Sequence, residues 1–291
     1  MGADEAPCPS RVRVSATVFL AVLLAALLHA AWNAMVKGGR DKDVAMLAVV
    51  LGSAPFGAVA ILVSPPPLPA SWGYIALGAA VHCGYQLFLL AAYRMGDFTQ
   101  VYPVARGSAP LIVAGVSVLL VGHALDAATL LGVALISGGL IAFALARALP
   151  QARALLPALA TGAFIATYSL TDGLGARLAG TALGFYGWET VLNSVVAALA
   201  IAAWRPALLG RTWREGRGVA LAGGGASFAA YAIVVWAFTE APIAAVTALR
   251  ETSIVFAMVI GVVVLRERVD WRRIAAAALT LAGAVTLRFA R

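Results

Sequence analysis

Two segments of the chain place the same ionisable and small residues at the same spacing. The shared pattern is an Arg, then an Asp, then a Gly, at a constant offset of 144 residues: Arg106, Asp126 and Gly139, and again Arg250, Asp270 and Gly283. The correspondence runs without a gap between 97–145 and 241–289. Each Arg lies in a long apolar run, where a charged side chain is costly and usually faces a bundle interior or a wet cavity. The spacing therefore predicts a membrane module built twice, with a guanidinium buried at the matching depth in each copy.

Further polar residues lie inside apolar runs, and helical spacing sorts them into faces. A charged metabolite needs buried groups of both signs, so we predict that these residues bind substrate: His29, Trp32, Asn33, His82, Gln86, Tyr102, Arg106, Tyr168, Asp172, Glu189, Arg250 and Glu251. Proton coupling would need a titrating group, and Asp172, Glu189, His29 and His82 are the candidates. Structural alternatives stay open: Glu251 could lock helices through an ion pair, and the two histidines could be core residues.

Two prolines, Pro103 and Pro110, lie in the same run as Arg106. A proline inside a helix removes one backbone hydrogen bond and frees the carbonyl four residues earlier, which for Pro110 is the carbonyl of Arg106. We therefore predict a kink that gates a cavity at this charge. The corresponding second run has only Pro242, at its start, so it is predicted to move as a rigid helix that hinges at its end.

The elements that must position these residues are membrane helices. The chain is 62% hydrophobic and 12% charged, with a mean hydropathy of +0.93, and a helix needs about 20 apolar residues to cross a bilayer. Unbroken runs favour helices over a barrel, so the fold class is all-α, a polytopic bundle. Ten spans are predicted, at 16–37, 43–63, 72–94, 98–121, 127–146, 153–173, 180–203, 217–239, 242–265 and 270–288.

These spans form a tail at 1–15, a first repeat at 16–146 and a second repeat at 153–288. Five spans per repeat is an odd number, so the second copy enters the membrane from the opposite side and the repeats are inverted, as in many secondary transporters. The fifth and tenth spans carry almost no polar residue. They are predicted to be scaffold, and a homodimer through them is left open.

Charge and cysteine content exclude several classes. The net charge of +8 needs no nucleic acid, because loop arginines at lipid headgroups explain it. Two cysteines, Cys8 and Cys83, imply no disulfide frame, and we predict no metal, no cofactor and no catalytic residue. A cleaved signal peptide at the first run is disfavoured because nine more runs follow. Fourteen Lys and Arg residues fall in one set of loops and five in the other, a bias that would put both termini outside.

Three short stretches stand out beside the two five-span halves: the run "LLHAAWNAMVK", the stretch "SLTDGLGAR" and the turn "LRERVDW" before the last span. In these features the chain resembles the EamA group of the drug/metabolite transporter (DMT) superfamily. It implies ten helices around a central cavity, with the fifth and tenth spans outermost, and the transport of small metabolites. It names no substrate.

We therefore predict a secondary transporter in the cytoplasmic (inner) membrane, multi-pass, whose partners are a small-molecule substrate and the lipid bilayer. The substrate is a small polar metabolite, an amino acid or derivative being one option, moved by alternating access in the direction of efflux. Two alternatives remain. A lipid-linked carrier or flippase would need a lateral opening, and an intramembrane enzyme would need a metal-ligand pair or nucleophile motif that the runs do not show.

Overall fold

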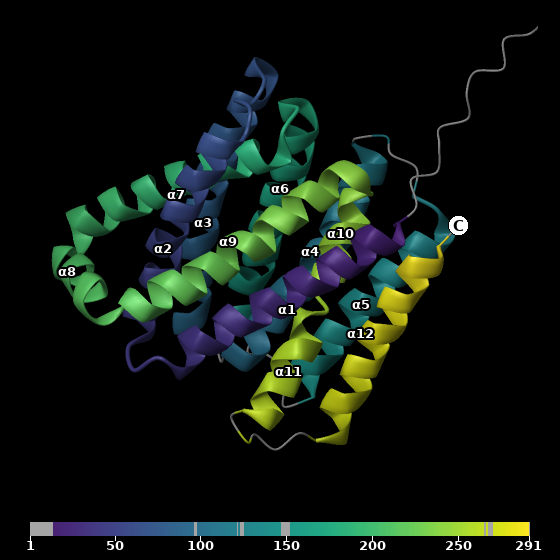
Figure 1. Ribbon diagram of the computed structural model, residues 1–291. Coiled ribbons are helices and arrows are strands. Elements are labelled where there is room, and N and C mark those ends of the chain that lie inside the picture. The colour runs from purple at the N-terminus through teal and green to yellow at the C-terminus, as the bar shows by residue number, and fades with distance from the viewer. Residues whose placement is uncertain are drawn as a thin grey trace, which may run out of the picture.

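The computed structural model describes residues 14–95, 98–120, 125–146, 152–264 and 270–290, with 122 and 266. Within these ranges the side chains of residues 86–87, 89–102 and 152–154 are outside the description. The helices are α1 (Ala16–Gly38), α2 (Lys42–Val63), η1 (Pro69–Ser71), α3 (Trp72–Met95), α4 (Phe98–Leu119), α5 (Ala127–Leu145), α6 (Ala152–Ala179), α7 (Ala182–Trp204), α8 (Pro206–Glu215), α9 (Arg217–Glu240), α10 (Ile243–Arg250), α11 (Ser253–Val263) and α12 (Trp271–Phe289). Figure 1 shows them as one bundle.

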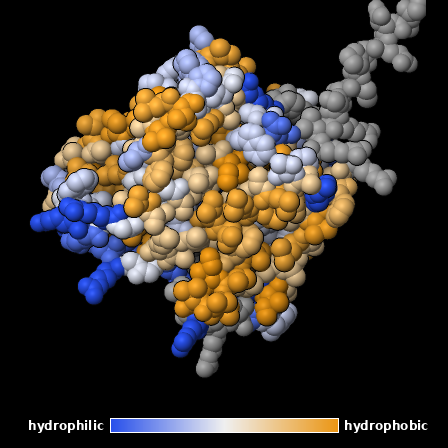
Figure 2. All heavy atoms as spheres, viewed as in Figure 1, coloured by the Kyte–Doolittle hydropathy of each residue, from blue (hydrophilic) through white to orange (hydrophobic). Residues whose placement is uncertain are grey.

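The predicted all-helical class is confirmed, and each predicted apolar range overlaps a helix. Among the described residues, six helical segments are long and apolar enough to cross a membrane: α1, α2, α5, α7, α9 and Ile243–Val263. Apolar side chains cover much of the visible face (Figure 2), and large apolar side chains such as Leu62 and Leu199 are strongly exposed. Such a surface suits lipid, so the chain is a multi-pass membrane protein. The count of ten crossings and the inverted relation of the halves remain predictions.

The repeated Asp and Gly residues have matching structural roles. Asp126 caps α5 by accepting from Thr129 N at 2.8 Å, and Asp270 caps α12 by accepting from Arg273 N at 3.0 Å. Helices α5 and α12 pack along each other (Figure 1). Their backbones approach closely at glycines: a Cβ added to Gly139 would lie 2.3 Å from Thr280 Oγ1, and one added to Gly283 would lie 2.8 Å from the carbonyl oxygen of Gly132. Small residues at such contacts let membrane helices pack tightly.

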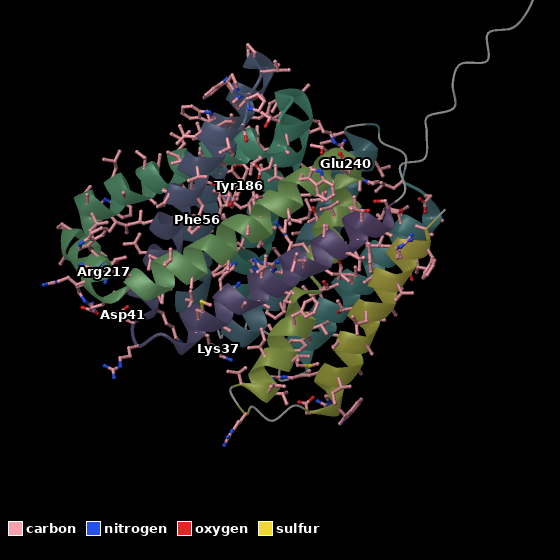
Figure 3. All side chains as sticks on the ribbon, viewed as in Figure 1. Lys37, Asp41, Phe56, Tyr186, Arg217 and Glu240 are labelled. Atoms are coloured by element: carbon pink, nitrogen blue, oxygen red, sulfur yellow. The ribbon has the colours of Figure 1, made fainter. Side chains whose placement is uncertain are left out.

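Charged side chains gather at one end of the bundle. Lys37, Asp41 and Arg217 lie at this end, and Glu240 lies at the other (Figure 3). Helix α8 has a strongly amphipathic sequence and leaves the indole of Trp213 exposed, as an interfacial helix does. The sequence analysis expected no element there.

Ion pairs at this end join α8 and its flanks to α2. Arg205 pairs with Asp43 at 2.8 Å and Arg211 with Asp41 at 2.8 Å. The backbone N–H of Val44 and the Arg211 guanidinium both donate to the Asp41 carboxylate, and these hydrogen bonds hold its pKa below the ordinary value. All four side chains are well exposed, so these pairs contribute little to stability.

The most enclosed element is α10. Each of its residues from Ile243 to Arg250 is buried, and it contacts α1, α4, α5, α6, α9 and α12. Because α10 is surrounded by other helices, its charged C-terminal end lies in the centre of the bundle. That end, at Arg250, begins the candidate site.

Candidate functional site

The segment predicted as one rigid span at 242–265 is broken in its middle. Helix α10 ends at Arg250 and α11 begins at Ser253, with Glu251 and Thr252 between them. The backbone hydrogen bonds there span three residues, as in a 3₁₀ turn: Glu251 N donates to Ala248 O and Thr252 N donates to Leu249 O. Thr252 Oγ1 also donates to Leu249 O at 2.7 Å, so a side chain satisfies part of the interrupted ladder.

The segment is therefore not one continuous helix, as the predicted span implied, and a hinge at Pro242 stays a prediction. Helix α4 was expected to be the kinked one, yet it continues as one helix through Pro103 and Pro110, both buried. At the break, the Thr252 hydroxyl donates to Leu249 O and Glu251 pairs with Arg106 and Arg250, and no Pro or Gly marks it in the sequence. Broken helices at membrane depth are tolerated inside protein and often line transport sites. A gating role for the two prolines stays a prediction.

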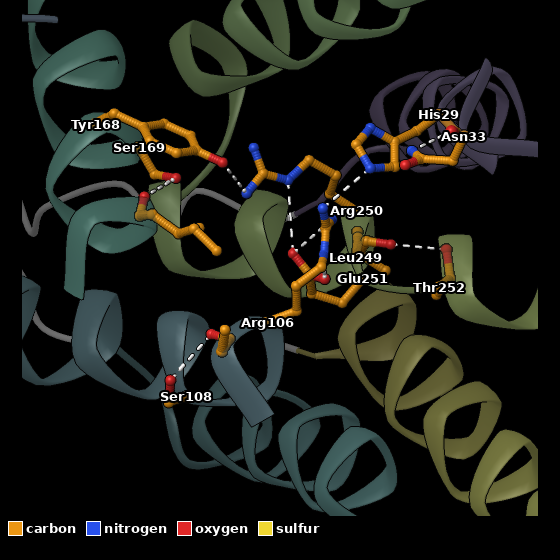
Figure 4. Close-up of polar contacts among 12 residues, drawn as sticks. His29, Asn33, Arg106, Ser108, Tyr168, Ser169, Leu249, Arg250, Glu251 and Thr252 are labelled. Carbon is orange, nitrogen blue, oxygen red and sulfur yellow. Dashed lines mark hydrogen bonds and ion pairs between the residues drawn. The ribbon is translucent and has the colours of Figure 1, made fainter. Parts of the chain in front are cut away.

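Glu251 lies at the break and joins the two repeated arginines. Arg106 donates to its carboxylate through two nitrogens, Nε to Oε2 at 2.5 Å and Nη2 to Oε1 at 3.0 Å, the bidentate geometry of a strong pair. Arg250 Nε lies 3.6 Å from Oε1 of the same carboxylate. Arg106 Nη1 also lies 3.0 Å from His29 Nε2 (Figure 4). Since a guanidinium only donates, His29 accepts through Nε2.

Arg250 is less completely satisfied than Arg106. Its Nη2 donates to Tyr168 OH at a long 3.4 Å (Figure 4), and its Nε has no hydrogen-bond acceptor among the described residues. The guanidinium carbon lies 5.6 Å from the ring centre of Tyr168 and 5.7 Å from that of Tyr231, within cation–π range. The side chain is 3% exposed. Arg250 is therefore a buried cation with donor capacity left for an anionic group.

A second cluster holds His82, Asp172 and Glu189, from α3, α6 and α7. His82 Nε2 lies 3.2 Å from Asp172 Oδ2 and 3.3 Å from Glu189 Oε1. Tyr231 OH donates to Asp172 Oδ2 at 2.5 Å. By contrast, the other Asp172 oxygen and both Glu189 oxygens form no hydrogen bond within the described part of the chain. Two buried carboxyl groups thus share one histidine.

Aromatic rings join the two clusters. The His82 ring stacks on Tyr168 with centres 4.3 Å apart, and Tyr168 also contacts Arg250. Tyr231 touches both clusters, through Asp172 and through Arg250. The sequence analysis missed Tyr231, although it is the one tyrosine in an otherwise apolar run at 219–237. The arrangement is a continuous buried patch of both charges.

Gly78 of α3 is a second residue that sequence reasoning missed. A Cβ added there would lie 2.5 Å from Glu189 Oε1 and 2.9 Å from Asp172 Oδ1. Both carboxyl groups therefore lie against the bare backbone of this glycine. No sequence signal distinguishes it from the other glycines in the apolar runs.

Of the remaining predicted residues, three lie on α1 and two have side chains outside the description. His29 and Trp32 meet edge to face at 5.0 Å, and Asn33 Nδ2 donates to the backbone oxygen of His29. Trp32 Nε1 is buried with no acceptor among the described residues. The side chains of Gln86 and Tyr102 lie outside the described residues.

Neither of the two cavities described for this conformation is lined by a residue of the charged clusters. One of about 410 Å³ is lined by Thr181 to Leu183, Ala232, Ile233 and Trp236, and one of about 480 Å³ by Ala176, Arg177, Gly180 to Ala182, Trp236 and Thr239. Both lie where α6, α7 and α9 end. The donor atoms of His82, Asp172 and Glu189 lie within 4.8 Å of one another, near enough to consider a metal ion.

Comparison with protein families gives one match. Residues 152–289 match the EamA-like transporter family. This match places the second half of the chain in the EamA family of the DMT superfamily and confirms the resemblance predicted from the sequence. The family is one of membrane transporters, so the match suggests a membrane transporter of the DMT type.

A solved crystal structure of another protein is similar over nearly the whole chain. It covers 94% of this chain and 96% of its own, with a TM-score of 0.71 and 19% identity. A likeness at this identity establishes the fold alone. A comparison with curated proteins gives no match.

Proposed function

We propose that the protein is a secondary transporter that exports a small polar metabolite across the cytoplasmic membrane by alternating access. The observation that carries the proposal is Arg250: a buried guanidinium at a helix break, with one nitrogen lacking an acceptor among the described residues. Burying charge at membrane depth costs several kcal/mol, and a purely structural pair would leave no donor unused.

The charges around Arg250 favour a zwitterionic substrate such as an amino acid. Arg250 would bind the carboxylate, and Asp172 or Glu189, joined to it through Tyr168 and Tyr231, would bind the ammonium group. Arg106 already donates two hydrogen bonds to Glu251. We therefore assign Arg106 to holding the break in place, rather than to the first contact with substrate.

Opening of the site would need the broken segment to move. The Arg250 and Glu251 side chains are only 3% and 0% exposed, so the charged patch is closed in this conformation. The backbone hydrogen bonds between α10 and α11 mostly span three residues, as from Glu251 N to Ala248 O, so the regular helical pattern is interrupted there. A change at this break would expose Arg250 without unfolding α4.

The test is uptake of a 14C-labelled mixture of the twenty amino acids into proteoliposomes, with protein-free liposomes as blank. Arg250→Gln is expected to lower uptake about tenfold or more, the value of a hydrogen bond to a charged group. Arg217→Gln, which changes an exposed guanidinium at the bundle end, is the matched control and should transport normally. The flippase alternative predicts a different result. Uptake of this mixture and of phosphorylated sugars would equal the blank, and labelled lipid would be scrambled between the leaflets.

A further inference from the structure

The histidine and the two carboxyl groups of α3, α6 and α7 are spaced as ligands of one metal ion. His82 Nε2 lies 3.2 Å from Asp172 Oδ2 and 3.3 Å from Glu189 Oε1, whereas a hydrogen bond between a charged imidazole and a carboxylate is usually about 2.7–2.9 Å long. Two atoms that each bind a tetrahedral Zn²⁺ at about 2.0–2.1 Å lie about 3.3 Å apart. All three donor atoms are within 4.8 Å of one another, so one ion placed among them can contact each.

Glu189 gives an independent sign that a ligand belongs at this place. Its side chain is 2% exposed, and neither of its carboxylate oxygens accepts a hydrogen bond from the described residues. Asp172 is 0% exposed, and its Oδ1 also lacks a donor within the described part of the chain. Buried carboxylates in proteins are paired or coordinate metals. Three buried oxygens without donors, beside a histidine nitrogen, therefore form a site of the kind that binds a divalent cation.

A divalent ion also balances the charge of the cluster. With His82 neutral, the two ionised carboxylates carry a charge of −2, and unpaired charge at membrane depth is costly. Arg250 does not contact either carboxylate, because its guanidinium lies against the Tyr168 and Tyr231 rings and beside Glu251. One divalent cation between the carboxylates makes the cluster neutral.

The residues around the cluster orient the ligands. Tyr231 OH donates to Asp172 Oδ2 at 2.5 Å, the kind of outer-shell hydrogen bond that holds a ligating carboxylate in place. The His82 ring is stacked on Tyr168 at 4.3 Å and meets Tyr231 edge to face at 5.7 Å. Gly78, which has no side chain, lets both carboxyl groups come close to α3. His82 alone of the three ligands keeps some exposed surface, 16%, so an ion would reach the cluster along its side.

We propose that His82, Asp172 and Glu189 bind one divalent transition-metal ion, Zn²⁺ by preference. One imidazole and two carboxylates suit Zn²⁺, and three protein ligands leave a fourth position for water. Mg²⁺ requires octahedral coordination by oxygen and is not favoured here. The sequence analysis predicted no metal, because the ligands come from three helices and form no local motif.

Metal binding has a consequence for transport that rests on the proposed function. The ammonium group of the substrate was assigned to Asp172 or Glu189, so the metal and the substrate compete for the same carboxylates. Zn²⁺ is therefore expected to inhibit uptake. The binding itself does not depend on what the protein transports.

Binding is tested first without substrate. Purified protein, freed of its affinity tag and of bound metal, is titrated with Zn²⁺ by isothermal calorimetry. We expect one Zn²⁺ per chain, and His82→Gln and Glu189→Gln should each weaken binding more than about a hundredfold, beyond the 10–100-fold typical of an outer-shell partner. Glu215→Gln, which changes an exposed carboxylate at the bundle end, is the matched control and should bind normally. No binding to wild type, or full binding to Glu189→Gln, overturns the proposal.

Two variants keep all three ligands and so separate binding from folding. Tyr231→Phe removes only the O–H that orients Asp172 and should weaken Zn²⁺ binding about 10–100-fold. Gly78→Ala would place a methyl 2.5 Å from Glu189 Oε1 and 2.9 Å from Asp172 Oδ1, and should also weaken it. Gly73→Ala on the same helix meets nothing within 4 Å and should not. Unchanged affinity in both Tyr231→Phe and Gly78→Ala would place the ion elsewhere and overturn the assignment.

Co²⁺ in place of Zn²⁺ reports the geometry, because a tetrahedral Co²⁺ site absorbs visible light far more strongly than an octahedral one. We expect a strong visible band in wild type that is absent in His82→Gln. Excess Mg²⁺ should leave this band in place. Its loss on addition of Mg²⁺ would overturn the preference for a transition metal.

Competition is then measured with the 14C amino-acid mixture in proteoliposomes. Zn²⁺ should inhibit wild-type uptake, and a higher amino-acid concentration should relieve the inhibition. The uptake that Tyr231→Phe retains should need about 10–100-fold more Zn²⁺ for half inhibition, in line with its weaker binding. Zn²⁺ that binds without inhibiting overturns the competition. The absence of all uptake would contradict the proposed function, while the calorimetric titration would still decide the metal site.

Discussion

The pair between Arg106 and Glu251 makes a quantitative prediction about stability. Both side chains are buried, at 4% and 0% exposure, and they share two hydrogen bonds. Removing one partner from such a pair costs about 3–5 kcal/mol, because the other charge is left buried and unpaired. Arg106→Gln is therefore expected to lower the free energy of unfolding by about 3–5 kcal/mol. Glu251→Gln should cost at least as much, since it leaves Arg250 unpaired too.

The double variant Arg106→Gln/Glu251→Gln should lose less than the sum of the two single losses, because two neutral amides replace the two paired charges. We expect the double-mutant cycle to give a coupling of about 2–3 kcal/mol, at the upper end for contacting residues. The assay is unfolding by sodium dodecyl sulfate in mixed micelles, followed by tryptophan fluorescence. Arg217→Gln is the matched control and should change stability by less than about 0.5 kcal/mol. Single losses that simply add in the double variant would refute the assignment of Arg106 to a coupled pair.

Three further outcomes are expected. Gly139→Ala should destabilise the α5–α12 contact by about 1–3 kcal/mol through overpacking, whereas Gly138→Ala, whose Cβ meets only Leu279 at 3.9 Å, should be nearly neutral in the same unfolding assay. Thr252→Val removes the hydroxyl that donates to Leu249 O and should slow uptake more than Pro110→Ala does. Distances between spin labels on α4 and α11 check the motion. If these distances are unchanged in both variants, motion at either place is contradicted. Because the pKa of Asp41 is lowered on folding, its small stabilising contribution is present above the unfolded pKa and is lost as pH falls through the folded one, so Asp41→Asn should flatten the acid limb of a thermal-melting profile.

Helix positions could be predicted from the sequence because apolar runs are long and their caps are local. The range predicted at 127–146 corresponds to α5 (Ala127–Leu145), which Asp126 caps. For the repeated glycines, Gly139 and Gly283, the sequence shows only their matching spacing. Their contact across α5 and α12 required the packing of two segments far apart in the chain.

The break at Glu251 could not be predicted from the sequence. No Pro or Gly marks it, and it depends on Arg106 of another helix and on a threonine hydroxyl that any helix surface could carry. Helix α8 was missed because an amphipathic helix in the interface has no long apolar run. Tyr231 and Gly78 were missed because their roles come from the partners that folding brings to them.

Uptake by proteoliposomes at a fixed inside-acid pH gradient, compared between wild type and Arg250→Gln, tests the central claim most directly. We predict that wild type accumulates at least one component of the 14C amino-acid mixture, and that Arg250→Gln inserts and purifies normally but loses about tenfold or more of that uptake. Equal uptake by the two proteins would contradict the assignment of Arg250 to the substrate.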